Sequence, residues 1–298
     1  ENITDDNLLT KEGLHWSDKT YVDIITGKEK GIINHSDTFG AQNTPNVPVK
    51  AYRMNNGDKG RINFVGTTKS GINLDLLWTV KNSDREDWKK NSGYNNDNRI
   101  KGLAFTGEQF IPNTNGNSIV TLYNEANKLS LSYQIVKHGT YEENPVLVNF
   151  ISTDIDAAQG VESNISNLAE VIPEDSKLKV SNNIIYDATP GVEGLNGSID
   201  LPKGGYLGVG FLSNFDYTFY SPAPMRRNDS YNYAIAVRYD IFGSSLQVKM
   251  NTKIKQKYRV NYLNLKGEKI LSSKTYTGYN NKNYKIPIPK IDKYTKLY

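Results

Sequence analysis

The sequence predicts an all-β protein in which a large antiparallel β-sandwich is followed by a small β module. Apolar and polar residues alternate through most of the chain, whereas the 3.6-residue period of an amphipathic helix is nearly absent. Twenty tyrosines and nine phenylalanines favour strands, and the glycines and asparagines between the alternating segments favour turns. Many short strands separated by such turns indicate a sandwich rather than alternating βαβ units.

Nine segments of the large part alternate as strands do, and one other segment predicts a short helix, at residues 164–171. In the second of the predicted strands, Leu74, Leu76 and Trp78 point to one face, where we expect the core. Asp75 and Thr79 point to the opposite face. The nine predicted strands are residues 61–67, 72–80, 119–123, 129–136, 146–152, 206–212, 216–220, 233–241 and 246–250.

Charge divides the chain into two unequal parts. Residues 249–298 hold 13 basic and two acidic side chains, whereas residues 1–248 hold 23 basic and 30 acidic ones. A step of this size predicts two bodies, a sandwich domain over residues 1–252 and a small module over residues 253–298. The basic part either lies near a polyanion such as wall teichoic acid or is an ordinary solvated face. It lacks a motif of arginine and aromatic residues of the kind that recognises nucleic acid.

The composition excludes several classes of protein. The chain has no cysteine, which rules out disulfides, a thiolate nucleophile and a metal site with cysteine ligands. No apolar run reaches the about 20 residues that a membrane-spanning helix needs. The sequence begins at Glu1 rather than Met, so we expect an exported fragment from which the signal and anchor segments have been removed.

Two polar segments carry the residues that predict ligand binding. Residues 82–99 contain Trp88 and Tyr94 among charged residues and asparagines, and residues 221–231 contain Arg226, Arg227 and Tyr231. Aromatic rings stack on the C–H faces of sugars, and neighbouring polar side chains bond their hydroxyls. The sequence therefore predicts a glycan-binding site in these loops, although Trp88 can equally anchor its loop to the sandwich.

An acidic turn follows the predicted strand at residues 146–152. Asp154, Asp156 and Gln159 supply oxygen atoms of the kind that calcium prefers, and these residues form the predicted metal site. The alternative is an Asx turn in which each carboxylate accepts hydrogen bonds from nearby backbone amides.

No residues are predicted to be catalytic, and we expect a binding protein rather than an enzyme. The three histidines are scattered without the spacing of a metal or catalytic motif, and no serine lies in a nucleophile elbow. Two acids at positions i and i+2, Asp154 and Asp156, do not establish the separation that glycoside hydrolysis requires.

The last part of the chain resembles the mucin-binding-protein (MucBP) repeat of Gram-positive surface proteins, which is a small, ubiquitin-like β module. The matching residues are Val260–Tyr262, Gly267–Ile270, Thr277–Gly278, Tyr284 and Ile291–Tyr294. The repeat normally continues through further strands, so the resemblance implies a truncated copy in a stalk.

The large part resembles the lectin-like sandwich domains of Gram-positive adhesins, of the glucan-binding protein C and antigen I/II variable-domain type. The resemblance rests on residues 148–162, 205–211 and 215–220. It implies an extracellular, cell-wall-anchored adhesin, monomeric within a longer chain, that binds a host glycan, mucin or glycoprotein. Capture of a matrix protein such as fibronectin or fibrinogen, and secreted glycan hydrolysis, are the alternative functions.

Overall fold

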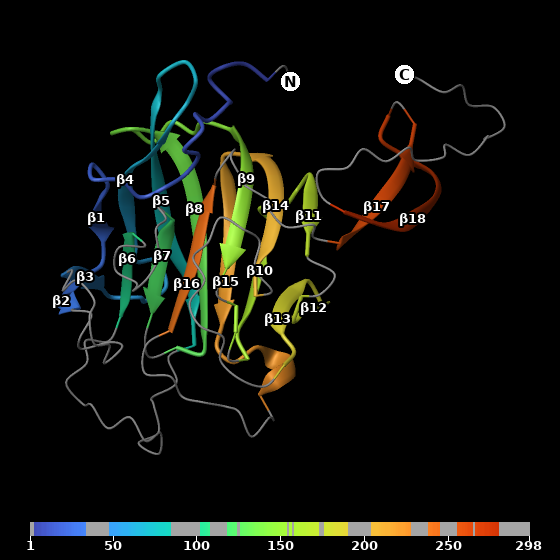
Figure 1. Ribbon diagram of the computed structural model, residues 1–298. Helices are drawn as coiled ribbons and strands as arrows, with labels where there is room; N and C mark the ends of the chain where they lie inside the picture. Colours follow the sequence, from blue (N-terminus) through green and yellow to red (C-terminus); the bar gives the residue numbers. More distant parts are fainter. Residues whose placement is uncertain are drawn as a thin grey trace.

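The computed structural model shows two stacked antiparallel β-sheets of eight strands each and a separate two-stranded sheet (Figure 1). It describes residues 3–33, 48–84, 102–107, 118–123, 126–153, 155–156, 158–172, 176–189, 204–227, 238–244, 255–264 and 266–279, with the backbone alone for residues 238–244, 255–257 and 277–279. Within these ranges, no helix has the length and hydrophobicity that crossing a membrane requires. The prediction of an all-β sandwich is confirmed.

All the strand pairs are antiparallel, and both sheets mix strands from distant parts of the chain. The first sheet has the order β1 (Tyr21–Thr26), β4 (Lys59–Thr67), β5 (Asn73–Ser83), β8 (Lys128–Lys137), β15 (Asn214–Tyr220), β10 (Gly160–Ser163), β13 (Ile184–Asp187) and β12 (Leu178–Ser181). The second has the order β11 (Ala169–Val171), β14 (Tyr206–Leu212), β9 (Val146–Thr153), β16 (Arg238–Ser244), β7 (Ile119–Tyr123), β6 (Leu103–Gly107), β3 (Val49–Tyr52) and β2 (Glu29–Ile33). The two-stranded sheet pairs β17 (Lys255–Leu263) with β18 (Lys269–Tyr279), and a 3₁₀ turn, η2 (Pro224–Arg226), follows β15.

The core lies between the two large sheets and is rich in aromatic rings. Trp78 of β5 is fully buried, as predicted, and its ring lies 5.4 Å from that of Phe105 in the second sheet. Phe150 of β9 reaches across to Tyr217 of the first sheet, with 5.9 Å between ring centroids. A Cβ at Gly60 would lie 2.5 Å from the Trp78 ring, so glycine lets β4 approach this indole. Burial of such rings is the main stabilising term in a sandwich of this kind.

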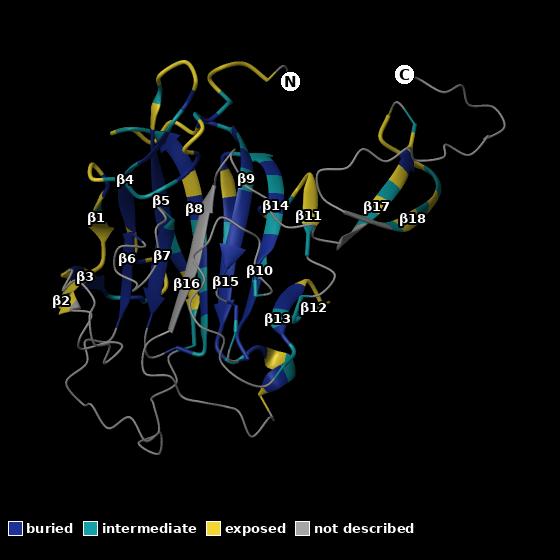
Figure 2. Cartoon of the chain, viewed as in Figure 1, coloured by how far each residue is buried: buried dark blue, intermediate teal, exposed yellow. Residues whose placement is uncertain are grey.

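Strands β6 and β7 are buried on both faces (Figure 2). Their sequences, LAFTG and IVTLY, are nearly continuous apolar runs without the alternation of a half-exposed strand. The predicted strand at residues 119–123 coincides with β7, and that at 206–212 coincides with β14. The other predicted strands agree with their observed counterparts to within a few residues, except that residues 233–237 and 246–250 lie outside the described residues.

The prediction of a helix at residues 164–171 is wrong. Residues 169–171 form the edge strand β11, paired with β14, and the residues before it form bends. The side chain of Asn164 accepts a hydrogen bond from the Asp216 amide (2.8 Å), and Asn167 exchanges two bonds with the backbone of Phe211 (2.9 and 3.0 Å). Asparagine side chains that bond neighbouring backbone compete with helix formation, which explains the error.

The small module begins with a hairpin beside the sandwich, next to β11 (Figure 1). Lys266 and Gly267 form the predicted turn between β17 and β18, and Gly267 has a φ of +80°, which glycine adopts without strain. The predicted boundary at residue 252 falls at residues that are not described, so the division into two domains stays a prediction.

Candidate functional site

The two segments predicted to bind a ligand, residues 82–99 and 221–231, follow strands that finish at the same end of the sandwich. In the first sheet, Ser83 at the end of β5 pairs with Leu129, and Lys128 pairs with Tyr220 at the end of β15. Gly160, the first residue of β10, pairs with both Tyr220 and Tyr186. These registers place one end of β5, β8, β15, β10 and β13 in a single row.

The second sheet has a corresponding row at the same end. Tyr123, the last residue of β7, pairs with Leu103 and with Arg238, and Tyr206 pairs with Ser152 near the end of β9. Short connections from β7 to β8 and from β9 to β10 join the two rows, so both lie at one end of the sandwich, which we call the loop end (Figure 1).

Three long connections join strands at the loop end. They are residues 84–102, 188–205 and 221–237. Connections longer than about 12–15 residues are uncommon in compact domains and are often functional. Trp88, Tyr94 and Tyr231 belong to two of them and lie outside the described residues, so their role as ligand-binding residues stays a prediction.

The two predicted arginines have different environments. Arg226, in η2, is buried, and its Nη1 donates hydrogen bonds to the carbonyls of Asp187 (2.6 Å) and Thr189 (3.1 Å). Arg227, the next residue, is exposed. The contacts of Arg226 therefore hold residues 221–227 against the end of β13, while Arg227 is the member of the pair that faces solvent.

A buried carboxylate, Asp187, organises the same corner, and sequence reasoning missed it. It accepts hydrogen bonds from the backbone amide and hydroxyl of Thr189 (3.0 and 2.8 Å) and from the amide of Ala158 (3.3 Å). Ala158 has a φ of +68°, an unusual conformation for alanine that these contacts stabilise. The Asp-Ala-Thr sequence after a strand is a signal for an Asx turn that could have indicated this role.

Two of the three predicted metal residues, Asp156 and Gln159, are joined by hydrogen bonds within a turn. The Gln159 amide donates to the carbonyl of Asp156 (2.7 Å), and the Asp156 amide donates to Oε1 of Gln159 (3.2 Å). Asp154 is not described, and the described residues contain no group of three or more histidine, aspartate or glutamate side chains suited to a metal. Gln159 uses its side-chain oxygen within the turn, and both the calcium site and the alternative of an Asx turn stay predictions.

Tyr220 forms a polar contact at the rim of the loop end. Its hydroxyl donates to Oε2 of Glu162 (2.8 Å), and Nζ of Lys128 lies 5.9 Å from the centroid of its ring. Burial, followed by the hydrogen bond to the negative charge of Glu162, raises the pKa of Tyr220 to about 12, and the positive charge of Arg227 opposes this shift. Arg227, Lys128 and Glu162 thus add a charged border beside the long connections.

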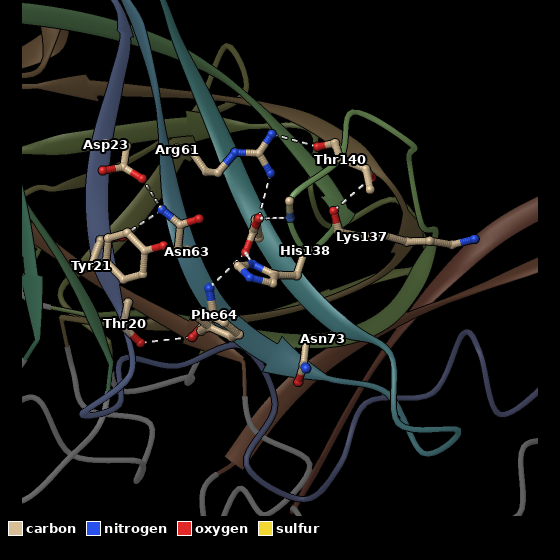
Figure 3. Close-up of polar contacts among 12 residues, drawn as sticks. Thr20, Tyr21, Asp23, Arg61, Asn63, Phe64, Asn73, Lys137, His138 and Thr140 are labelled. Carbon is tan, nitrogen blue, oxygen red and sulfur yellow. Dashed lines mark hydrogen bonds and ion pairs between the residues drawn. The ribbon is translucent and has the colours of Figure 1, made fainter.

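The opposite end is built around Asp75 (Figure 3). Asp75 lies on the face of β5 opposite Leu74 and Leu76, and its side chain is nevertheless 0% exposed. Its Oδ1 accepts hydrogen bonds from the Phe64 amide (2.9 Å) and from Nδ1 of His138 (2.8 Å), and its Oδ2 accepts from Nη1 of Arg61 (2.6 Å) and the Gly139 amide (2.9 Å). Four donors therefore satisfy the buried carboxylate, and we call this end the Asp75 end.

Residues 138–144 fold over the outer face of β5 and account for this burial. Arg61 also donates to the carbonyl oxygen of Thr140 (2.7 Å), and the backbone amide of Asn144 donates to the carbonyl oxygen of Ile135 (3.0 Å). These two hydrogen bonds hold the segment in place. Burial raises the pKa of Asp75, but the bonds from Gly139, Phe64, His138 and Arg61 outweigh it and hold the pKa below its ordinary value.

Asp75 and His138 form an acid–imidazole pair of the type found in hydrolases. The imidazole stacks on Phe64, with 3.8 Å between ring centroids, and Phe64 has a φ of +56° in a bulge of β4. In the described part of the chain, no serine or threonine hydroxyl hydrogen-bonds to this imidazole. The described contacts give the pair a structural role in joining three strands.

The comparisons with known proteins yield a weak structural similarity and no family. No protein-family model matches the chain, and no curated protein matches its sequence. It is similar in structure to the N-terminal domain of the Streptococcus gordonii adhesin Sgo0707, with 8% sequence identity and a TM-score of 0.41 over 90% of this chain and 73% of that one. A TM-score this low does not establish a shared fold, and the resemblances to the lectin-like domains and the MucBP repeat stay predictions.

Proposed function

We propose that this chain is the ligand-binding part of a bacterial surface adhesin, and that the loop end of the sandwich binds a host glycan or glycoprotein without catalysing a reaction. The observation that carries the proposal is that the strands joined by residues 84–102, 188–205 and 221–237 have their connected ends at the same end of an antiparallel sandwich. Many β-sandwich recognition domains present their binding loops in this way.

The residue content of these connections favours a glycan as the ligand. Trp88, Tyr94 and Tyr231 supply flat apolar rings, and asparagine and arginine side chains, Arg227 among them, supply hydrogen-bond partners. We therefore assign sugar stacking to the three aromatic residues and polar contacts to Arg227. The buried Arg226 holds the connection in place.

The proposal is tested by binding of the whole chain to a glycan array, to mucin and to matrix glycoproteins. Replacing Trp88, Tyr94 or Tyr231 by alanine should weaken binding about tenfold or more for at least one residue, which corresponds to about 1.4 kcal/mol. Tyr141→Ala is the matched control, because Tyr141 is an exposed tyrosine (68%) at the Asp75 end and should leave affinity unchanged.

Three results would contradict the proposal. Absence of binding to every surface would remove the adhesin function. Equal binding to a deglycosylated matrix protein would assign the loop end to protein recognition. Release of reducing sugar that is lost in Asp154→Asn or Asp156→Asn would establish a hydrolase.

A further inference from the structure

The hairpin of β17 and β18 has one packed face and one exposed face. Along β17, Tyr258, Val260 and Tyr262 are buried or partly buried, whereas the residues between them are exposed. The rings of Tyr258 and Tyr276 stack with 5.6 Å between centroids, and the Tyr262 and Tyr276 hydroxyls are 3.4 Å apart. The described aromatic side chains of the hairpin, those of Tyr258, Tyr262 and Tyr276, therefore gather on its packed face.

The other face carries most of the described positive charge, and we call it the basic face. The exposed Lys274 is the exception, since it pairs with Val260 on the packed face. Arg259 pairs with Thr275, Leu263 pairs with Lys269, and Lys266 lies in the turn between the strands. Arg259, Lys266 and Lys269 are all exposed. Lys257 and Lys255 lie two and four residues before Arg259, so the backbone register places them on the same face of β17. They pair with Thr277 and Tyr279.

No described carboxylate neutralises these cations. Glu268 is the one acidic residue between Lys255 and Tyr279, and its Oε2 accepts a hydrogen bond from the side-chain amide of Asn264 (2.6 Å). Among the described residues, Arg259, Lys266 and Lys269 form no ion pair with an aspartate or glutamate. The basic face therefore presents positive charge to solvent, next to a sandwich region with an excess of acidic residues.

We propose that the basic face binds a linear polymer of polyol phosphates. A ligand that binds these dispersed cations must carry several negative charges, because a single anion gains little affinity from a surface lysine in water. Same-face residues along a strand lie about 6.6 Å apart, so an extended chain of phosphates can contact several cations of the hairpin at once. The acidic residues of the sandwich repel such a chain and confine it to the hairpin.

The arrangement of the aromatic residues selects among polyanions. Single-stranded nucleic acids gain affinity from bases that stack on exposed rings, and sugars likewise stack on aromatic faces. The exposed side chains described on the basic face, those of Arg259, Lys266 and Lys269 among them, include no aromatic ring, and Tyr258 and Tyr276 stack on the other face. The backbone register also places Tyr279 on the basic face, opposite Lys255, and its side chain lies outside the described residues. A polyol phosphate has no rings, and lysine binds phosphate as a point charge, so charge alone suffices for its recognition.

The test measures binding of the whole chain to poly(glycerol phosphate), to inorganic polyphosphate and to single-stranded DNA at several salt concentrations. The triple variant Arg259→Gln, Lys266→Gln and Lys269→Gln should weaken binding of poly(glycerol phosphate) at least tenfold. The slope of log Kd against log salt should fall by about two to three, one for each lost phosphate contact.

The control variant removes the same charge from exposed lysines of the sandwich, with Lys19→Gln, Lys69→Gln and Lys179→Gln. It should change the affinity by less than about twofold. Equal weakening in both variants would overturn the proposal by showing a response to net charge alone. Tighter binding to DNA than to poly(glycerol phosphate) would overturn the choice of ligand, as would absence of binding to any polymer.

A second copy of the chain is the competing occupant, since the basic face complements the acidic sandwich. Sedimentation at low salt should show a monomer, and a dimer abolished by the triple variant would overturn the proposal. Polymer binding is independent of the loop end: the Trp88→Ala variant should bind poly(glycerol phosphate) as the unaltered chain does, whatever the outcome on glycan arrays.

Discussion

The two ends of the sandwich use buried charge in different ways. At the Asp75 end, strand β4 and the short connection between β8 and β9 supply the four donors that satisfy one carboxylate. At the loop end, Arg226 and Asp187 bond mainly to backbone groups and fix only the bases of much longer connections. The comparison indicates that short, hydrogen-bonded segments close one end, whereas the binding that we propose is assigned to the longer connections at the other end.

The strongest test of this comparison is Asp75→Ala. The substitution leaves the Arg61 guanidinium, which is 10% exposed, without its carboxylate, and it should lower the free energy of unfolding by about 3–5 kcal/mol. Urea unfolding at neutral pH measures the loss. Asp216→Ala is the control, because Asp216 forms an exposed ion pair with Lys81 (2.9 Å), and it should cost at most about 1 kcal/mol. Equal losses would show that the Asp75 end has no special role.

A smaller loss is expected for Arg226→Gln at the loop end. The variant removes two charge-assisted hydrogen bonds to backbone carbonyls and should cost about 1.5–3 kcal/mol. Because Arg226 and Asp75 share no partners and lie at opposite ends, the double variant should lose the sum of the single losses to within about 0.5 kcal/mol. A larger deviation in the urea midpoints would contradict the separation of the two ends.

The two ends should also respond at opposite limits of pH. The folded-state pKa of Asp75 is lowered, so its contribution to stability is present above its ordinary value of 3.8 and is lost as pH falls further through the folded-state pKa. The pKa of Tyr220 is raised to about 12 from 10.0, so its contribution is present below pH 10 and is lost as pH rises toward 12.

Unfolding midpoints measured between pH 2 and pH 12 test this assignment. Asp75→Asn should reduce the fall of the unfolding midpoint at acid pH and leave its fall at alkaline pH unchanged. Tyr220→Phe should reduce the fall at alkaline pH and leave the fall at acid pH unchanged. The alkaline change should be partial, because the pKa of Tyr52 is also raised to about 12, chiefly by burial. A fall at acid pH that is unaffected by Asp75→Asn would assign the acid sensitivity to other carboxylates.

Local patterns predicted most of the strands, because side chains on a strand alternate between two faces and the core requires one of them to be apolar. The same rule placed Asp75 opposite Leu74 but could not predict its burial, since the residues that cover it are 63 to 65 positions away in the chain. At the loop end, sequence grouped Arg226 with Arg227 because they are adjacent, and only the packing of η2 against Asp187 separated their environments.

The sequence by itself determined the all-β class, the turn positions, the charge step near residue 249 and the identity of the aromatic loop residues. These follow from local properties: backbone preference, periodicity and composition. The tertiary structure alone decided which connections share an end of the sandwich, which carboxylates are buried and which face of the last hairpin is basic. Each of these depends on pairing between strands far apart in the chain, and alternation within one strand holds no information about its partner.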